Sequence, residues 1–246
     1  QGEAAGLLPH QRVPVRYDTL ILDLGGVLIN VDYGATGRHF EALGAQGFDA
    51  LYSKAKQSDL FDRFETGELS AQGFRNEVRA MLGPGLSDAE IDAGWNAMLG
   101  TIPPERIDLV HRLKKRYCLL LLSNTNAIHA PAFEAIIARD LGIRDFRSLF
   151  HGAYYSCELG MRKPSADIFH YVAAKHQADA ARTLFIDDSI QHVEGARRAG
   201  LHAEHLELHP RVVGDDASDE CTRRPWDIDQ PRADHAAGQR LGYGQR

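Results

Sequence analysis

Short apolar runs alternate with amphipathic stretches along most of the chain. Five runs have the length and composition of strands: TLILDL, YCLLLLSNTN, HGAYYS, TLFIDDS and LHAEHLEL. The stretches between the later runs have helical spacing, as in PERIDLVHRLKKR, where Pro104 suits a first turn, and SADIFHYVAAKH, where Ser165 suits an N-cap. Strands that alternate with helices predict an α/β fold with a Rossmann-like, doubly wound parallel sheet.

The interval after the first strand has a different pattern. Residues 33–103 contain no strand-like run, only the helical patterns ATGRHFEALG, SAQGFRNEVRAML and SDAEIDAGWNAML, the last with a capping box from Ser87 to Glu90. We therefore expect a small helical insertion here. No comparable insertion follows the second strand, because the chain between Ser123 and Lys163 has room only for a helix and a short strand.

These patterns divide the chain into parts. Residues 17–32 and 104–212 form the expected core, and 33–103 form the insertion. Residues 1–16 are an expected N-terminal extension. Residues 213–246 are polar, charged and without periodicity, which predicts a disordered tail.

Net charge and cysteine content narrow the range of possible functions. Of 246 residues, 28 are Lys or Arg and 34 are Asp or Glu, a net charge of -6, which argues against a nucleic-acid or anionic-membrane partner. The charge of an anionic substrate would therefore have to be neutralised locally, by a metal ion or by a single lysine. Three cysteines without CxxC spacing argue against a disulfide framework or a zinc site, and they predict a cytoplasmic location. No apolar run has the length to span a bilayer.

Polar groups follow the predicted strands at one edge of the sheet. They are Asp23, then Ser123 with Asn124 and Thr125, then Lys163, then Asp187 with Asp188. Each alone has an ordinary explanation, as a helix cap or a solvated side chain. In a parallel sheet, however, successive strand ends converge in space, and ligands bind there. Together, these residues predict a site.

The residue types suit phosphoryl transfer. An aspartate is already ionised at neutral pH, so Asp23 needs no neighbouring base to act as a nucleophile. Several carboxylates that face one another repel and call for a cation, and an all-oxygen site suits Mg²⁺. The hydroxyls of Ser123 or Thr125, the turn amides near Gly25 and the Lys163 ammonium could then cradle phosphate oxygens.

Four motifs resemble those of the haloacid dehalogenase-like (HAD) superfamily. They are DLGGVL, LLLLSNT, GMRKPSADIF and FIDDSIQHVEGARRAGL, in the family's order, from about Asp18 to Leu206. The insertion resembles the family's C1 cap. The ETGELS and LGMRKP segments look closest to α-D-glucose-1-phosphate phosphatases and the amino-terminal phosphatase domains of epoxide hydrolases.

The resemblance implies a role for each matching residue. Asp23 would be the nucleophile that forms an aspartyl phosphate and also a Mg²⁺ ligand, with the Gly25 carbonyl and Asp188 as further ligands. Asp187 would support the metal's waters or orient Lys163, and the order within the adjacent acidic pair stays open.

Ser123 and Asn124 would bind phosphate, and Lys163 would hold it against Asp23. The expected activity is a Mg²⁺-dependent phosphatase acting on a small phosphate monoester, with a sugar phosphate favoured and a sugar 1-phosphate one option. The expected form is a monomer or homodimer.

The chain departs from the family pattern at Gly25, where most phosphatases of the superfamily carry a second Asp that protonates the leaving group. General acid catalysis contributes about 10² to 10⁴ in rate, so we expect either a substitute or a substrate with a good leaving group. Candidate substitutes are Asp32, Glu65 and Glu68, although a turn or solvated role is the simpler reading of each. The fourth motif also departs from the family pattern, with Ser189 and His192 where close relatives often carry amide side chains.

The cap is expected to close over the site and set specificity. Residues that could line it are Phe61, Phe64, Trp95 and Asn96, although the aromatic residues are more simply read as the cap's own core. Two rival functions stay open. One is a 2-haloacid dehalogenase-type hydrolase, which the acidic pair disfavours because displacement at carbon needs no metal. The other is a catalytically weak protein that binds a phosphorylated ligand or regulates, which Gly25 motivates.

Overall fold

The computed structural model describes residues 17–44 and 59–207. The expected N-terminal extension and C-terminal tail lie outside these residues, as do 45–58 of the insertion and the last five residues of the expected core, 208–212.

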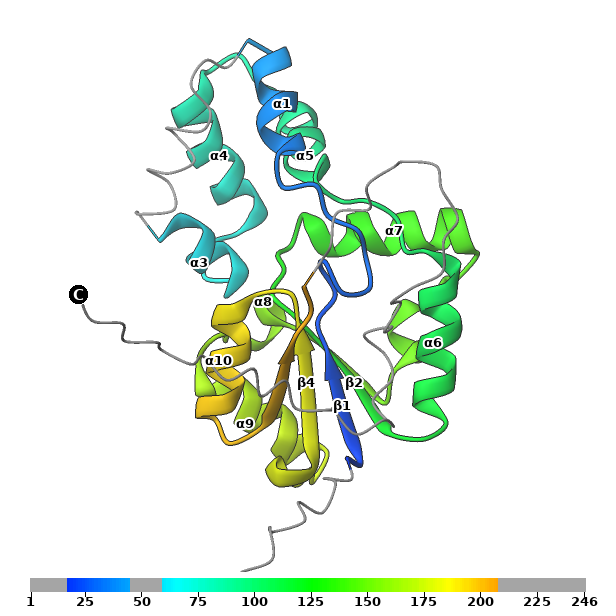
Figure 1. The fold of residues 1–246 in the computed structure, drawn as a ribbon. Helices are drawn as coiled ribbons and strands as arrows, with labels where there is room; N and C mark the ends of the chain where they lie inside the picture. The colour runs from blue at the N-terminus through cyan, green and yellow to red at the C-terminus, as the bar shows by residue number, and fades with distance from the viewer. Residues whose placement is uncertain (1–16, 45–58, 208–246) are drawn as a thin grey trace, which may run out of the picture. The chain divides into compact units, whose positions relative to one another are not determined.

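The centre of the fold is a five-stranded parallel sheet with strand order β3-β2-β1-β4-β5 (Figure 1). Its strands are β1 (Thr19–Leu22), β2 (Cys118–Ser123), β3 (Gly152–Tyr155), β4 (Thr183–Asp187) and β5 (His202–His205). In the centre, Leu22 of β1 pairs with Leu121 and Ile186 on its two neighbours. The predicted α/β fold is confirmed, and the carboxyl ends of β1, β2 and β4 lie next to one another.

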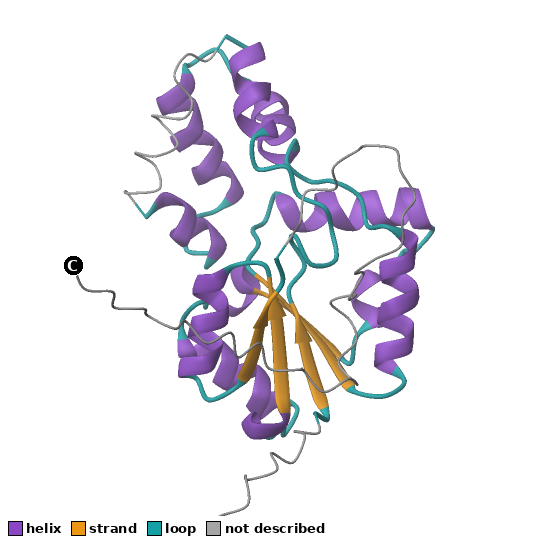
Figure 2. Ribbon diagram, in the orientation of Figure 1, coloured by secondary structure: helices purple, strands orange, loops and turns teal. Residues whose placement is uncertain are grey.

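Helices cover both faces of the sheet (Figure 2). They are α6 (Pro104–Lys114), α7 (His129–Leu141), α9 (Ala166–Lys175) and α10 (Ile190–Arg198). Pro104 opens α6, and the Ser165 hydroxyl caps α9, as predicted. One apolar cluster joins alternate strand residues to helices on one face: Ile21, Leu120, Leu122 and Phe185 pack with residues of α9 and α10. The three central strands, β1, β2 and β4, are almost wholly buried because helices cover both faces, whereas the edge strands β3 and β5 are partly exposed.

The insertion between β1 and β2 is helical in its described residues. It contains α1 (Ala35–Ala42), α3 (Leu60–Glu65), α4 (Ala71–Leu82) and α5 (Asp88–Asn96), of which α3 has no counterpart in the predicted patterns. The capping box of α5 forms as predicted. An aromatic-rich cluster fills the insertion and includes Phe40, Phe64 and Phe74, with Ile128 joining it from the start of α7. The insertion therefore has its own packing.

The segment between β2 and Lys163 carries more than the predicted helix and strand. After α7 and before β3 lies a 3₁₀ turn, η1 (Phe146–Leu149), and a single helical turn, α8 (Ser156–Leu159), follows β3 directly. A second 3₁₀ turn, η2 (Ala180–Arg182), precedes β4. In the described part of the chain, no helix is both long and apolar enough to cross a membrane.

Candidate active site

A buried ion-pair network lies at the carboxyl end of the sheet, with a lysine at its centre. Lys163 is completely buried, and its Nζ donates to Asp23 Oδ1 at 2.7 Å, to Asp187 Oδ2 at 2.6 Å and to the Leu122 carbonyl at 3.0 Å. Asp23 follows β1, and Asp187 ends β4, so two neighbouring strands deliver the two carboxylates. The convergence predicted from the strand ends is present.

The backbone of Lys163 is fixed by the loop after β2. The Asn124 side chain accepts from the Lys163 backbone N–H at 2.9 Å and donates to its carbonyl at 3.0 Å. The amide of Asn124 is therefore used to hold the lysine. Phosphate binding by Asn124 stays a prediction and would fall to its backbone N–H.

The other residues of this loop are also held in place. Ser123 is buried at the end of β2, and its hydroxyl makes a long contact of 3.4 Å with the Asn124 carbonyl. The Thr125 backbone exchanges two hydrogen bonds with the Ser156 hydroxyl, at 2.9 and 3.0 Å. Ser156, at the start of α8, was not identified from the sequence because it is 31 residues away from Thr125. The loop after β2 is thus held in place by hydrogen bonds to α8.

The two adjacent aspartates have different surroundings. Besides Lys163, Asp187 accepts from the Ser189 backbone N–H at 2.7 Å and lies 3.1 Å from His192 Nδ1. Asp188 instead lies against the turn after β1, where a Cβ on Gly26 would be 2.1 Å from Asp188 Oδ2. Asp187 is thus surrounded by partners, whereas Asp188 needs the glycine beside it to approach Asp23.

Three carboxylates come together at this point. Oxygens of Asp23, Asp187 and Asp188 lie within 4.8 Å of one another. Burial raises the pKa of Asp23 to about 7 although Lys163 opposes it, and burial together with Asp187 raises the pKa of Asp188. Burial also acts to raise the pKa of Asp187, but Lys163 and His192 outweigh it and hold that pKa below its ordinary value. One lysine therefore does not neutralise the cluster, and this all-oxygen donor set fits a divalent cation such as Mg²⁺.

There is room for a side chain at position 25, where the missing acid would stand. A Cβ on Gly25 would meet only the Val31 side chain, at an ordinary 3.6 Å. Gly26, in contrast, has a φ of 70° and abuts Asp188. The turn therefore requires glycine at position 26 and would accept a side chain at 25.

The three acids considered as substitutes are placed differently. Asp32 is exposed and paired with Arg38. Glu65 is largely buried and paired with Arg162, with Nη2 to Oε2 at 2.8 Å. Glu68 is exposed on the turn after α3. Two of the three are thus engaged with arginines, although burial outweighs Arg162 and raises the pKa of Glu65.

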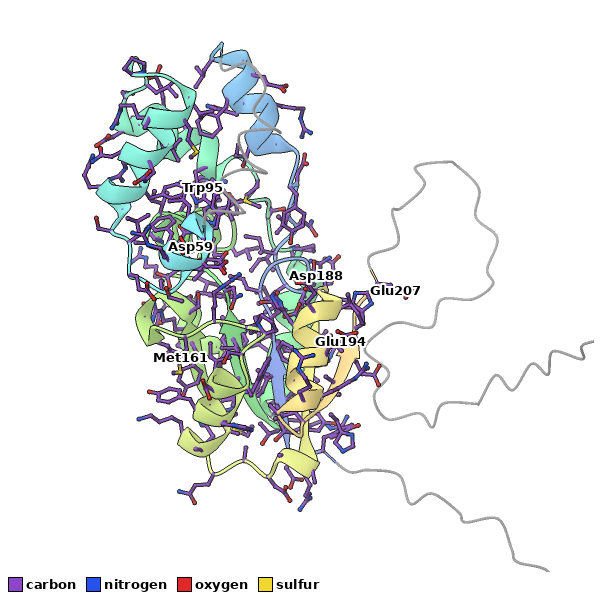
Figure 3. All side chains as sticks on the ribbon, turned by 90° about the vertical axis from the view of Figure 1, so that its left-hand side faces the viewer. Asp59, Trp95, Met161, Asp188, Glu194 and Glu207 are labelled. Carbon is purple, nitrogen blue, oxygen red and sulfur yellow. The ribbon has the colours of Figure 1, made fainter. Side chains whose placement is uncertain are left out.

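The cap aromatics pack mainly within the insertion, and Trp95 also packs on the core. Phe64 stacks on Phe74 with ring centroids 4.2 Å apart, and the Trp95 ring lies between Phe61 at 5.3 Å and His129 of α7 at 5.1 Å. Figure 3 shows Trp95 in the insertion and Asp188 near the end of the sheet. Within the described residues, Trp95 Nε1 and the amide oxygen of the next residue, Asn96, are buried without a hydrogen-bond partner. The rings serve packing, and these two polar atoms stay candidates for substrate contact.

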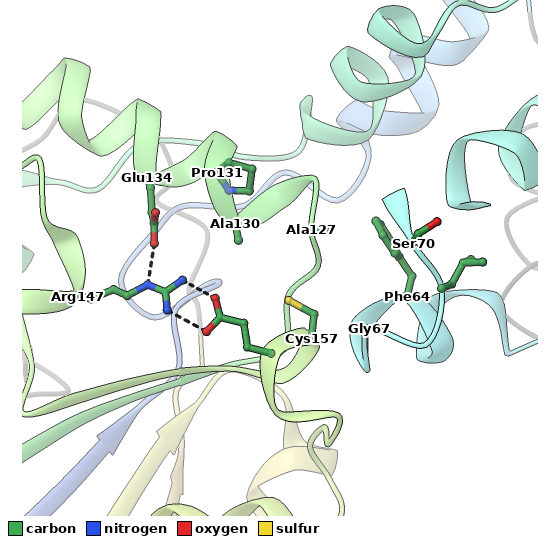
Figure 4. A pocket seen from close by; sticks show the side chains of 11 residues that line it. Phe64, Gly67, Ser70, Ala127, Ala130, Pro131, Glu134, Arg147 and Cys157 are labelled. Carbon is green, nitrogen blue, oxygen red and sulfur yellow. Dashed lines mark hydrogen bonds and ion pairs between the residues drawn. The ribbon is translucent and has the colours of Figure 1, made fainter. Parts of the chain in front are cut away.

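A pocket of about 440 Å³ lies between the insertion and the core (Figure 4). Phe64 and Leu69 line it from the insertion, and Arg147, bound to Glu158 at 2.6 Å and Glu134 at 3.1 Å, lines it from the core. None of the residues named above as nucleophile, lysine or acidic pair lines it. The pocket is therefore not the carboxylate site itself.

Comparison with known proteins places this geometry in a family. The family described as haloacid dehalogenase-like hydrolase matches residues 17–200, which include every element of the site. The chain belongs to the haloacid dehalogenase-like hydrolases.

Its relatives include phosphatases. D-ribitol-5-phosphate phosphatase of Bacteroides thetaiotaomicron is 27% identical over 187 residues, which cover 74% of this chain and 88% of the relative. A sesquiterpene phosphatase of Aspergillus oryzae is 28% identical over 150 residues, 61% of this chain and 73% of the relative.

A solved HAD family enzyme of Bacteroides thetaiotaomicron is 32% identical, with a TM-score of 0.72 over 80% of this chain and 97% of its own. That enzyme has also been crystallised with magnesium and inorganic phosphate; this form is 33% identical, with a TM-score of 0.70 over 80% of this chain and 98% of its own. These relatives support the family, and not specifically the glucose-1-phosphate phosphatase and epoxide hydrolase group predicted from ETGELS and LGMRKP.

Proposed function

We propose that this protein is a Mg²⁺-dependent phosphatase that hydrolyses a small, polyhydroxylated phosphate monoester, a sugar or sugar-alcohol phosphate, through an aspartyl phosphate on Asp23. The observation that carries the proposal is the buried cluster in which Lys163 bridges Asp23 and Asp187 while Asp188 lies beside them. Magnesium and phosphate in the structure of the related enzyme support the same chemistry. We assign residues 33–103 as the cap, and 17–32 with 104–212 as the core.

The placement of the residues supports the following reaction. A carboxylate oxygen of Asp23 forms a bond to phosphorus as the bond from phosphorus to the ester oxygen breaks, and the departing alcohol takes up a proton. Water then attacks the phosphorus of the aspartyl phosphate, which releases inorganic phosphate and restores the Asp23 carboxylate. Lys163 lies 2.7 Å from Asp23 and so would hold the transferring group against it.

Asp23, the Gly25 carbonyl and Asp188 would hold the metal. When bound there, Mg²⁺ neutralises charge on the phosphoryl oxygens that one lysine cannot neutralise alone. Asp187, enclosed by Lys163, Ser189 and His192, orients the lysine. This arrangement supports Asp188, rather than Asp187, as the direct ligand of the adjacent pair.

Ser123 and the N–H groups of its loop would bind the remaining phosphate oxygens. Asn124 contributes chiefly by fixing the Lys163 backbone. With no side chain at Gly25, the leaving alcohol must be protonated by water, by the substrate or by a cap residue. Esters with good leaving groups, such as anomeric phosphates, should therefore react fastest. The ribitol-phosphate relative instead points to a primary alcohol phosphate.

A panel of phosphate esters tests the proposal. It contains sugar 1-phosphates, sugar 6-phosphates, pentitol 5-phosphates and flavin mononucleotide, each assayed for phosphate release with Mg²⁺ and with EDTA. We expect Mg²⁺-dependent release from at least one sugar or polyol ester, and none from the Asp23→Asn variant.

Other outcomes would favour the rivals. Halide release from a 2-haloacid that survives EDTA would support the dehalogenase. Binding of phosphorylated ligands without hydrolysis across the panel would support a binding or regulatory protein.

A further inference from the structure

The turn that follows α3 makes a close backbone contact with the core. Gly67, in the ETGE turn of residues 65–68, has a φ of 74°, and a Cβ there would lie 2.3 Å from the Cys157 carbonyl oxygen of α8. Any side chain at this position would push the turn away from α8. The turn is also ordered internally, because the Leu69 N–H donates to the Arg63 carbonyl at 3.0 Å.

An ion pair accompanies this backbone contact. Arg162 Nε donates to Glu65 Oε2 at 2.9 Å, Nη2 lies 2.8 Å from the same oxygen, and Nη1 reaches Asp62. Arg162 and Glu65 are about three-quarters buried, whereas Asp62 is 62% exposed. Glu65 is thus the partner best shielded from solvent, and shielding strengthens an ion pair relative to an exposed one.

The arginine directly precedes the lysine of the site. The loop that carries both residues has three anchors: Arg162 on the ETGE turn, the Lys163 backbone on Asn124, and Lys163 Nζ on the two carboxylates. Two of these anchors belong to the core, and the third belongs to the insertion. The position of the lysine is therefore tied to the position of the ETGE turn.

We propose that Glu65 and Arg162 act as a latch between cap and core, so that docking of the ETGE turn sets the position of Lys163 against Asp23. Both are positioning residues, because neither touches the reacting atoms. When the latch is open, the loop has only its two core anchors, and the lysine is less precisely placed. The activity readout rests on the proposed phosphatase function, whereas the contact itself does not.

The chain offers a matched control. Inside the insertion, Arg75 binds Asp92 through two hydrogen bonds of 2.8 and 2.7 Å, with side chains 21% and 31% exposed. This pair resembles the latch in geometry and burial but touches neither the lysine loop nor the ETGE turn. Asp92→Asn therefore removes a comparable charge without opening the latch.

The kinetic test uses p-nitrophenyl phosphate with saturating Mg²⁺ and the variants Glu65→Gln, Arg162→Gln, their double variant, Arg162→Lys and Asp92→Asn. A misplaced group in an active site costs up to about 100-fold in rate, so we expect each Gln variant to lower kcat by about 10- to 100-fold with little change in KM. The double variant should be no worse than either single variant, and Arg162→Lys should recover part of the rate. Asp92→Asn should keep the wild-type kcat.

Hydrogen exchange on the full-length protein without substrate gives a readout independent of activity. Glu65→Gln should speed amide exchange in residues 160–165 and 65–70, whereas Asp92→Asn should not. Wild-type kcat with unchanged exchange in Glu65→Gln would overturn the latch, as would an equal fall in kcat in Asp92→Asn. If the wild-type protein hydrolyses no phosphate ester, the proposed function fails, and the exchange measurement still decides whether the latch exists.

Discussion

Replacing Lys163 with methionine removes the only cation that contacts both Asp23 and Asp187 among the described residues. Methionine keeps much of the volume of the lysine stem. The variant leaves two buried carboxylates facing each other, with Asp188 beside them and no lysine between them. It also leaves the Leu122 carbonyl without the hydrogen bond it now accepts at 3.0 Å.

The size of the effect follows from the burial. Removing one partner of a buried ion pair costs about 3–5 kcal/mol, and Lys163 is completely buried. For a domain of this size, 1 kcal/mol shifts Tm by roughly 2–4 °C, so we expect a fall of roughly 6–20 °C in EDTA. Mg²⁺ should stabilise the variant more than the wild type, because the cation takes over the neutralisation of the cluster.

Thermal and urea unfolding of both proteins, each with EDTA and with Mg²⁺, measure these shifts. Lys175→Met, at an exposed position near the end of α9, is the control and should change Tm little in either buffer. The reasoning is refuted if Lys163→Met unfolds like the wild type in EDTA, or if Mg²⁺ stabilises the two proteins equally.

Three further predictions concern the site. In single-turnover assays, Gly25→Asp should raise the rate at which alkyl phosphates phosphorylate Asp23 by about 10-fold or more while leaving that rate for phenyl phosphates little changed, because only the former need a proton on the leaving group; no rise would remove the missing-acid explanation. Because Asp23 in the metal-free protein has a pKa of about 7, calorimetry in buffers of different ionisation enthalpy should show Mg²⁺ releasing more protons one unit below that pH than one unit above; equal release at both would contradict this. Asn124→Ala should lower kcat by about 10- to 100-fold, because the Lys163 backbone loses two hydrogen bonds, and should keep Mg²⁺ affinity as measured by calorimetry; an equal loss of metal binding would mean a different role.

The sequence predicted the sheet and the convergence of its strand ends for a physical reason. A parallel sheet buried on both faces requires continuous apolar strands, and its topology brings Asp23, Ser123 and Asp187 to one edge whatever the loops do. The identities of the strand-end residues were therefore enough to locate the site. Most helices of the insertion were predicted as well, because capping signals such as that of Ser87 are local, but α3 was missed.

Hydrogen-bond partners between distant segments could not be read in this way. Asn124 has the residue type of a phosphate ligand, but its side chain holds the Lys163 backbone 39 residues away. The contact between His192 and Asp187 depends on the orientation of α10, which periodicity does not determine. Each of these contacts is set by packing rather than by local sequence.

The narrower family group was predicted from segments that contact each other. Glu65 of ETGELS and Arg162 of LGMRKP form an ion pair in this structure. We infer that the two segments report how the cap docks on the core, and that they carry less information about the phosphate ester.

The central claim is that Asp23 accepts the phosphoryl group. The most direct test is rapid acid quenching during turnover of p-nitrophenyl phosphate, whose leaving group needs no added proton, with Mg²⁺, followed by mass spectrometry of the peptide that contains Asp23. Because Gly25 has no side chain to activate water, we expect the intermediate to accumulate, with one phosphoryl group on Asp23 in Mg²⁺ and none in EDTA. Full turnover with Asp23 unmodified at every quench time, or with the phosphoryl group on another residue, would contradict the account.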